Sequence, residues 1–150
     1  MAYANTGEFN VLYPTRRRMA NILKRIVDAE LGEYSEGTLV SSIRINAKIT
    51  GFQKLEIQIV AAYYFIFLNN GAYLWNDGKI APRDFVSQFT IALDNAGLTA
   101  EIYDQYFEWL LKKYPLVEAI KVAEKNQKLV YTFEALFAPP DFIQGYPLDV

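Results

Sequence analysis

Three carboxylates come closest to a catalytic arrangement in this sequence: Glu101, Asp104 and Glu108. Asp104 and Glu108 are four residues apart, so on a helix their side chains would share one face, a turn apart. Paired carboxylates can divide acid and base roles when their surroundings separate their pKa values. Glu108 also precedes Lys112 by four residues, which is the spacing of an ordinary ion pair on an exposed helix. We therefore interpret these residues as a solvated helix face and predict that the protein is not an enzyme.

The amino-acid composition excludes most other kinds of catalytic site. The 150 residues include no cysteine and no histidine, which excludes disulfide bonds, thiol and imidazole nucleophile systems and the usual zinc sites. Gly32, Gly37 and Gly51 are isolated and are not followed by Lys-Ser or Lys-Thr, so the sequence predicts no phosphate-binding loop. We expect no cofactor and no metal. The net charge of −2 gives no general basic field, so nucleic-acid binding would need a local patch.

A run of arginines is the candidate for such a patch. Arg16, Arg17 and Arg18 fall in the first turn of a predicted helix. Cations at a helix N-terminus oppose the macrodipole and cost about a few tenths of a kcal/mol each, so helix stability does not explain them. A partner surface or a phosphate backbone would explain them. The alternative is a solvated face in which they pair with local carboxylates.

The arginines are placed on an amphipathic helix. Pro14 and Thr15 are typical of a helix start, with Thr15 as a possible N-cap. The helix is predicted to run to about Leu31 and to stop at Gly32. Its apolar residues recur at the spacing of one helix face: Met19, Ile22, Leu23, Ile26 and Val27.

A hairpin follows. Residues 43–49 and 55–59 alternate apolar and polar side chains in the same phase, the pattern of strands with one buried face. With a short turn between them, they are predicted to pair as an antiparallel hairpin. The aromatic run at 62–70 fits a buried strand or a buried helical turn equally well, and Gly71 ends it in either case.

The C-terminal half predicts three helices and a strand. The first helix would begin at Pro82-Arg83-Asp84, with Asp84 placed to cap the helix or to interact with its dipole, and Thr99 would cap the second. Pro115 would separate the second helix from a short third one, and residues 129–136 alternate as a last strand. We therefore predict an α+β fold: an antiparallel sheet built on the central hairpin, with amphipathic helices packed on one face.

One domain, residues 14–137, is expected between two terminal segments. Residues 1–13 are predicted as an arm or an edge strand that orders against a neighbour. The tail, residues 138–150, is rich in proline and aromatic residues, and could dock on a neighbouring subunit through Phe142 and Tyr146; a disordered terminus is the alternative. The N-terminus lacks signal-peptide features, and the longest apolar run is about half of the roughly 20 residues of a membrane span, so no membrane contact is expected.

Three short motifs follow one another along the chain. They contain Gly37, Leu39, Ser42 and Ile43 at the start of the first strand, Tyr64 seven residues before Gly71, and Pro82 and Phe85 at a helix start. In this order the motifs resemble those of the neck or tail-completion proteins of tailed bacteriophages, which are found where the tail meets the head. The resemblance covers about residues 15–97. The sequence departs from the family pattern at Glu36, at Asn69, where an acid is expected, and at Ala72.

The resemblance implies a structural protein of the virion, assembled in the bacterial host cytoplasm, without catalytic activity. Such a protein would form a homo-oligomeric ring at the neck or head–tail junction and would contact other connector and tail proteins. Arg16, Arg17 and Arg18 would be subunit contacts or would face DNA in the lumen of the ring. Aromatic residues, 15% of the chain, suit the interfaces of a closed ring.

A second hypothesis assigns the protein to a different class. The helices between Phe85 and Tyr114 carry a wide apolar and aromatic stripe. A small non-viral adaptor domain could use that stripe to dock a partner protein. The simpler interpretation of the same residues is that they fill the core.

Overall fold

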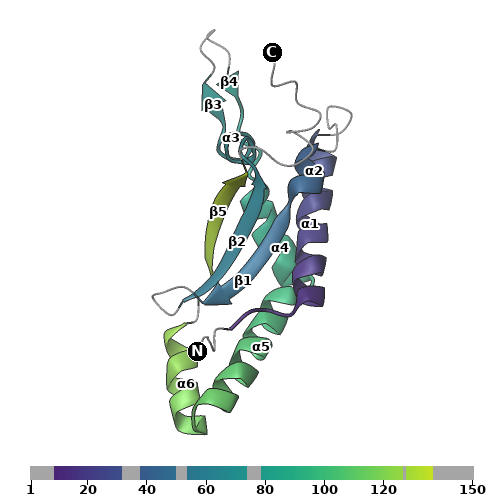
Figure 1. The fold of residues 1–150 in the computed structure, drawn as a ribbon. Coiled ribbons are helices and arrows are strands. Elements are labelled where there is room, and N and C mark those ends of the chain that lie inside the picture. The colour runs from purple at the N-terminus through teal and green to yellow at the C-terminus, as the bar shows by residue number, and fades with distance from the viewer. Residues whose placement is uncertain (1–8, 32–37, 50–53, 74–78, 127, 137–150) are drawn as a thin grey trace.

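The computed structural model describes residues 9–31, 38–49, 54–73, 79–126 and 128–136. In chain order the elements are α1 (Tyr13–Leu31), α2 (Thr38–Ser42), β1 (Arg44–Ile49), β2 (Leu55–Ala62), α3 (Phe65–Asn70), β3 (Ala72–Tyr73), β4 (Lys79–Ile80), α4 (Phe85–Asn95), α5 (Leu98–Lys113), α6 (Leu116–Lys125) and β5 (Val130–Leu136). Figure 1 shows helices and strands mixed in one fold, which confirms the predicted α+β class.

The central hairpin forms as predicted. β1 and β2 pair antiparallel, with Ile45 opposite Ile59 and Ala47 opposite Ile57. These four side chains are buried, because they all lie on the face of the sheet that the helices cover. The turn at residues 50–53 lies outside the described residues.

The prediction of a purely antiparallel sheet is wrong. The three-stranded sheet has the order β1-β2-β5, and β5 runs parallel to β2, with Ile59 opposite Phe133. Parallel strands need a long crossover connection, and here helices α3 to α6 supply it between the two strands. The alternation of residues 129–136 predicts a strand but does not indicate whether it runs parallel or antiparallel to its neighbour. That direction depends on where the last helix ends.

Two residues of the segment that leads into α1, residues 9–12, belong to the core. Phe9 and Val11 are buried, the Val11 N–H donates a 2.8 Å hydrogen bond to the Ala47 carbonyl, and Asn10 forms a bridge with Lys48. This short segment therefore runs along the free edge of β1, in line with the predicted edge strand. Residues 1–8 lie outside the described part of the chain.

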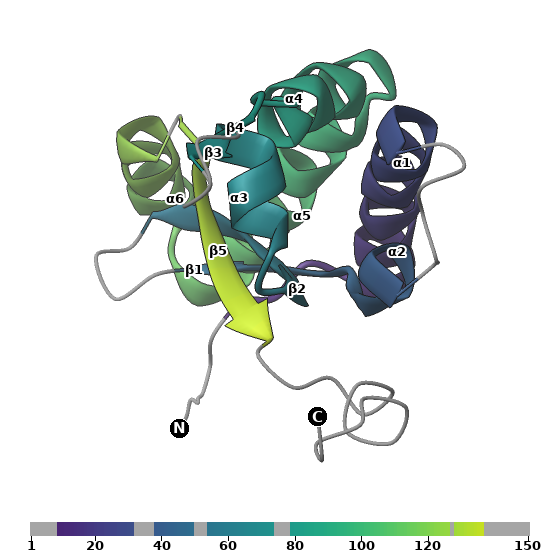
Figure 2. The ribbon, with the colours of Figure 1, turned by 90° about the horizontal axis from the view of Figure 1, so that it is seen from above.

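The helices gather on one side of the sheet. Seen from above, α1, α4 and α5 lie together on that side (Figure 2). Aromatic rings join the layers, since Phe65 of α3 stacks on Phe133 at 5.4 Å and Phe89 of α4 meets Tyr131 edge-on at 6.3 Å. The other face of the sheet carries polar residues, of which Asn46 donates to Gln58 at 3.0 Å.

The aromatic run at residues 62–70, predicted as either a buried strand or a buried helical turn, contains the end of a strand and a short helix. The strand continues to Ala62, and a short helix, α3, then begins at Phe65, whose ring is fully buried. Gly71 ends α3 with φ 82°, a value that glycine adopts readily. β3 and β4 then pair antiparallel, and the turn predicted at Asp77-Gly78 lies outside the described residues.

Two of the three predicted helix caps are wrong, and the third is correct in position but forms no capping bond. α1 begins at Tyr13, so Thr15 lies inside its first turn, where it is buried. Asp84 stands at the N-cap of α4 but has φ 51° and no capping hydrogen bond from its side chain. Gly97, with φ 74°, precedes α5, while the Thr99 hydroxyl donates back to Asp94 at 2.6 Å. Each cap depends on the direction from which the chain enters the helix, which residue type alone does not determine.

Candidate functional site, a basic groove

A groove of about 450 Å³ lies between α1 and the segment that leads into β1. Four cationic side chains line it: Arg16, Arg17, Lys24 and Arg44. Neutral polar side chains lie between them, and no described carboxylate lines the groove. We call this feature the basic groove. Cations gathered without counter-charges attract an anionic ligand or surface, so the groove is suited to binding an anion.

The periodicity of α1 explains one wall of the basic groove. Arg17, Asn21 and Lys24 are spaced at i, i+4 and i+7, so they share one flank of the helix. The opposite wall comes from β1, an edge strand, where Arg44 is exposed. The buried side chains of Ala20, Ile43 and Ile45 form an apolar floor.

The structure separates the three arginines of the predicted patch. The Arg16 side chain lines the groove but is partly engaged, since its Nε donates a 2.9 Å hydrogen bond to the Val11 carbonyl and its guanidinium lies 5.5 Å from the centre of the Tyr13 ring. Arg17 also lines the groove, is exposed, and forms no ion pair or hydrogen bond with the residues that the structure describes. Arg17 is therefore the arginine best placed to meet a ligand.

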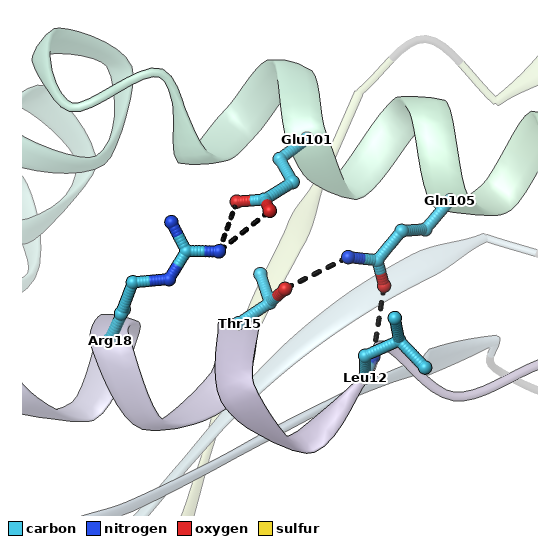
Figure 3. A network of polar contacts seen from close by, with 5 residues as sticks. All are labelled: Leu12, Thr15, Arg18, Glu101 and Gln105. Carbon is cyan, nitrogen blue, oxygen red and sulfur yellow. Dashed lines mark hydrogen bonds and ion pairs between the residues drawn. The ribbon is translucent and has the colours of Figure 1, made fainter.

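Arg18 faces away from the groove and binds within the molecule. Its Nη2 atom donates to both carboxylate oxygens of Glu101 on α5, at 2.6 and 2.7 Å (Figure 3). This is the ion pairing that the solvated-face alternative proposes, with a carboxylate 83 residues away instead of a local one. Spacing along one helix could not indicate this partner.

A second polar contact fixes the start of α1 to α5. The side-chain amide of Gln105 accepts a 2.9 Å hydrogen bond from the Leu12 N–H and donates a 2.8 Å bond to the Thr15 hydroxyl (Figure 3). The same amide thus satisfies a backbone donor at the helix start and a buried hydroxyl. Together with the Arg18 pair, it holds in place the helix that carries the basic groove.

The carboxylates on α5 do not form a concave site. Glu101 is occupied by Arg18, and Asp104 and Glu108 are exposed on the helix surface. Within the described ranges, no three acidic side chains lie close enough together to hold a metal ion. The described helices also include none with the length and apolar character to cross a membrane.

The residues of the phage-like motifs build the frame beside the groove. Leu39, Ile43 and Phe85 are buried in the core. The Ser42 hydroxyl donates to the Leu39 carbonyl at 2.7 Å and accepts from the Ala62 N–H at 2.9 Å, so it joins α2 to the end of β2. These residues position the start of β1, which is one wall of the groove.

The other described motif residues lie outside the buried core. The Tyr64 ring is half-buried and meets the Tyr63 ring edge-on at 5.5 Å, and Pro82 is exposed. Gly71 has the positive φ described above. Gly37 lies outside the described residues, as do Phe142 and Tyr146 of the tail, so the structure does not bear on their predicted roles.

Sequence reasoning missed two surface features. The first is the meeting of Arg44 with the α1 cations, because only the packing of α1 on β1 brings them together. The second is an exposed apolar corner between α5 and α6. It consists of Leu111, Leu116, Val117 and Ile120, whose exposed fractions range from 41 to 62%. The α6 sequence predicts a helix but cannot show which side of it is left uncovered.

Comparisons of this chain with protein-family models, with curated proteins and with solved structures found no match.

Proposed function

We propose that this protein is a structural component of a tailed-bacteriophage virion, acting at the neck or head–tail junction, where it assembles with copies of itself and with neighbouring connector or tail proteins. The proposal combines the motif resemblance with one structural observation. That observation is the basic groove, whose cations lie on α1 and β1 without a described carboxylate in the groove lining. A groove of this kind suits a contact with an acidic protein surface and needs no catalytic group.

The motif residues also support the proposal. In the described range, Ser42 joins α2 to β2 through two hydrogen bonds and Phe85 is buried in the core, and these motif residues form no catalytic or metal-binding arrangement. A scaffold that only positions a contact surface is what a ring subunit requires. DNA in a ring lumen is the less favoured partner of the groove, because the chain as a whole has a net charge of −2.

Reversing two groove charges tests the contact. Arg17→Glu combined with Lys24→Glu should leave the circular dichroism spectrum unchanged, since neither side chain is buried. The particle mass, measured by light scattering for the protein alone and mixed with its virion neighbours, should fall toward that of separate subunits. Arg16 and Arg18 are left intact, because both form bonds that hold the fold.

The matched control is Arg25→Glu with Lys112→Glu, which changes the net charge equally at exposed positions away from the groove. It should assemble like the parent protein. Equal assembly by the groove variant and the parent would reject the groove as the contact. Binding of duplex DNA that only the groove variant loses would assign the groove to a lumen contact instead. A gene position away from portal and tail genes would reject the virion role itself.

The adaptor hypothesis now depends on a different surface. Phe85, Phe89, Ile102, Tyr106 and Leu110 are at most 2% exposed, so most of the proposed aromatic docking face fills the core. Of the predicted stripe, Leu111 is exposed and belongs to the apolar corner between α5 and α6, whose other residues lie on α6, beyond the stripe. Exposed apolar side chains favour protein contacts. Val117→Asp with Ile120→Asp would abolish partner capture if an adaptor used this corner.

A further inference from the structure

We infer that the basic groove is the binding site of the chain's own C-terminal segment, residues 138–150. The inference deepens the proposed function by naming the occupant of the contact groove. It rests on that function only where the segment comes from a second copy. The segment lies outside the described residues, and the inference rests on its sequence and on the place where the described chain stops.

The chemistry of the segment complements the groove. Residues 138–150 contain Asp141 and Asp149 and no lysine or arginine, while four cations and no described carboxylate line the groove. Phe142 and Tyr146 add aromatic rings, which guanidinium groups contact favourably through their faces. An acidic and aromatic peptide thus matches both the charged walls and the apolar floor.

Prolines reduce the cost of binding for this segment. Pro139, Pro140 and Pro147 fix the backbone toward extended conformations. Less conformational entropy is therefore lost when such a segment is held in a groove. This property favours the tail over a flexible acidic peptide of the same charge.

The described chain stops at the end of the sheet where β1 begins. Leu136, the last described residue, pairs with Ala62 and accepts a 2.9 Å hydrogen bond from the Tyr63 N–H. The Ala62 N–H in turn donates to Ser42, which stands between the groove residues Ser41 and Ile43. The segment therefore starts at the end of the sheet where the groove opens.

The distance is within reach of a few residues. β5 and β1 are separated by two strand spacings, or about 10 Å, and each extended residue covers about 3.3 Å. Residues 137–140 can thus bring Asp141 and Phe142 to the β1 wall of the groove, either in the same chain or, at high concentration, in a neighbouring copy. Tethering favours the first arrangement, and a closed assembly favours the second.

A nucleic acid fits the groove less well than this peptide. Phosphate backbones are usually bound by extended basic surfaces, whereas this groove is bounded, has an apolar floor of Ala20, Ile43 and Ile45, and belongs to an acidic chain. A short peptide with carboxylates and aromatic rings can contact both the cationic walls and the apolar floor of the groove.

Paramagnetic broadening in the full-length protein tests the inference. The chain has no cysteine, so Gly145→Cys carries a single nitroxide label in the middle of the segment. We expect a several-fold loss of amide signal at Arg17, Asn21, Lys24 and Arg44 and no loss along α6. The effect should weaken in 1 M salt, where the screening length falls to about 3 Å.

Charge variants of the labelled protein identify the contact. Arg17→Glu with Lys24→Glu should remove the broadening at the groove, and Asp141→Asn with Asp149→Asn should weaken it. Arg25→Glu, on another side of α1, should retain it. Groove signals that stay unbroadened, or broadening that the groove variant leaves unchanged, would overturn the inference. Unbroadened groove signals that shift on addition of a DNA oligonucleotide would overturn it in favour of a nucleic acid.

A mixed sample separates this inference from the proposed function. It combines isotope-labelled protein without the nitroxide and unlabelled protein that carries it. Groove broadening in this mixture supports the pairing and shows that it joins two copies, as the assembly role requires. Broadening only within one chain also supports the pairing, but removes the tail as the link between subunits.

Discussion

The side-chain oxygen of Asn69 accepts a 2.9 Å hydrogen bond from the backbone N–H of Val86. Asn69 lies in the last turn of α3 and Val86 in the first turn of α4, so a residue of one helix caps the next. Two backbone bonds strengthen this corner, from Arg83 to the Leu68 carbonyl at 3.0 Å and from Asp84 to the Asn69 carbonyl at 3.3 Å. The corner fixes the point at which Phe85 enters the core.

Asn69→Ala should reduce the free energy of unfolding by about 1 kcal/mol, the usual cost of a lost N-cap acceptor. Asn69→Asp keeps the oxygen and adds a negative charge at the helix N-terminus, so its stability should equal or exceed that of the parent. Urea unfolding measures both variants. Asn70 is unsuitable as a control because its side-chain oxygen accepts a 2.7 Å hydrogen bond from the Asn69 amide. Asn95→Ala, at an exposed position in the last turn of α4, is the control, and a similar loss in both alanine variants would contradict the capping role.

The same corner shows why the sequence predicted the helices better than their caps. The helix start at Pro82-Arg83-Asp84 could be seen, because proline and the apolar spacing that follows are local signals. The capping oxygen comes from Asn69, 17 residues before Val86. Asn69 is also the position where the phage-like pattern expects an acid, and either residue type can accept from the helix N-terminus. Local spacing gives no information about such a partner.

Ser42→Ala should cost about 1–3 kcal/mol, because it leaves the buried N–H of Ala62 without its acceptor. Ser87→Ala, an exposed serine on α4, is the matched control and should have little effect on stability, since alanine favours helices. Thermal and urea unfolding compare the two variants. Equal stability would show that the Ser42 bridge is not needed to join α2 to β2.

Gly97→Ala tests the cost of backbone strain separately from any steric clash. Gly97 has φ 74°, and a Cβ added there would have no heavy atom within 4 Å, so no clash accompanies the change. The expected loss is about 1–2 kcal/mol, from the left-handed conformation alone. Gly97→Asn should cost less, because asparagine tolerates this conformation better. Unfolding in urea distinguishes the two, and identical losses would point to a cause other than the backbone angle.

The basic groove marks a second limit of sequence reasoning. Consecutive positions predict a single cluster for Arg16 to Arg18. On the helix, however, neighbouring side chains point in different directions, so Arg18 pairs with Glu101 while Arg17 lines the groove. Arg44 joins them only through tertiary packing of α1 on β1. Similarly, the alternation of residues 129–136 predicts a strand but not the parallel direction of β5. Periodicity identifies faces, and packing decides which faces meet.

Alkaline pH should destabilise the protein through its buried tyrosines. Burial raises the pKa of Tyr106 above its ordinary value of 10.0, although a hydrogen bond from Asn126 acts in the opposite direction, and burial also raises the pKa of Tyr131. The folded state therefore retains these protons at pH values where the unfolded chain has lost them. The free energy of unfolding should be unaffected by these groups below pH 10. Above pH 10 it should fall with rising pH until the folded pKa values are passed.

Tyrosine variants identify the groups behind this alkaline loss. Tyr106→Phe removes one buried phenol, so stability should fall less steeply above pH 10, after an initial loss of about 1 kcal/mol because the oxygen no longer accepts from Asn126. Tyr131→Phe should reduce the slope in the same way, and the double variant should reduce it further. Urea unfolding at a series of pH values measures the slopes. Parallel curves for the parent and all three variants would show that these phenols do not cause the loss, because each proton retained on folding must contribute to the slope.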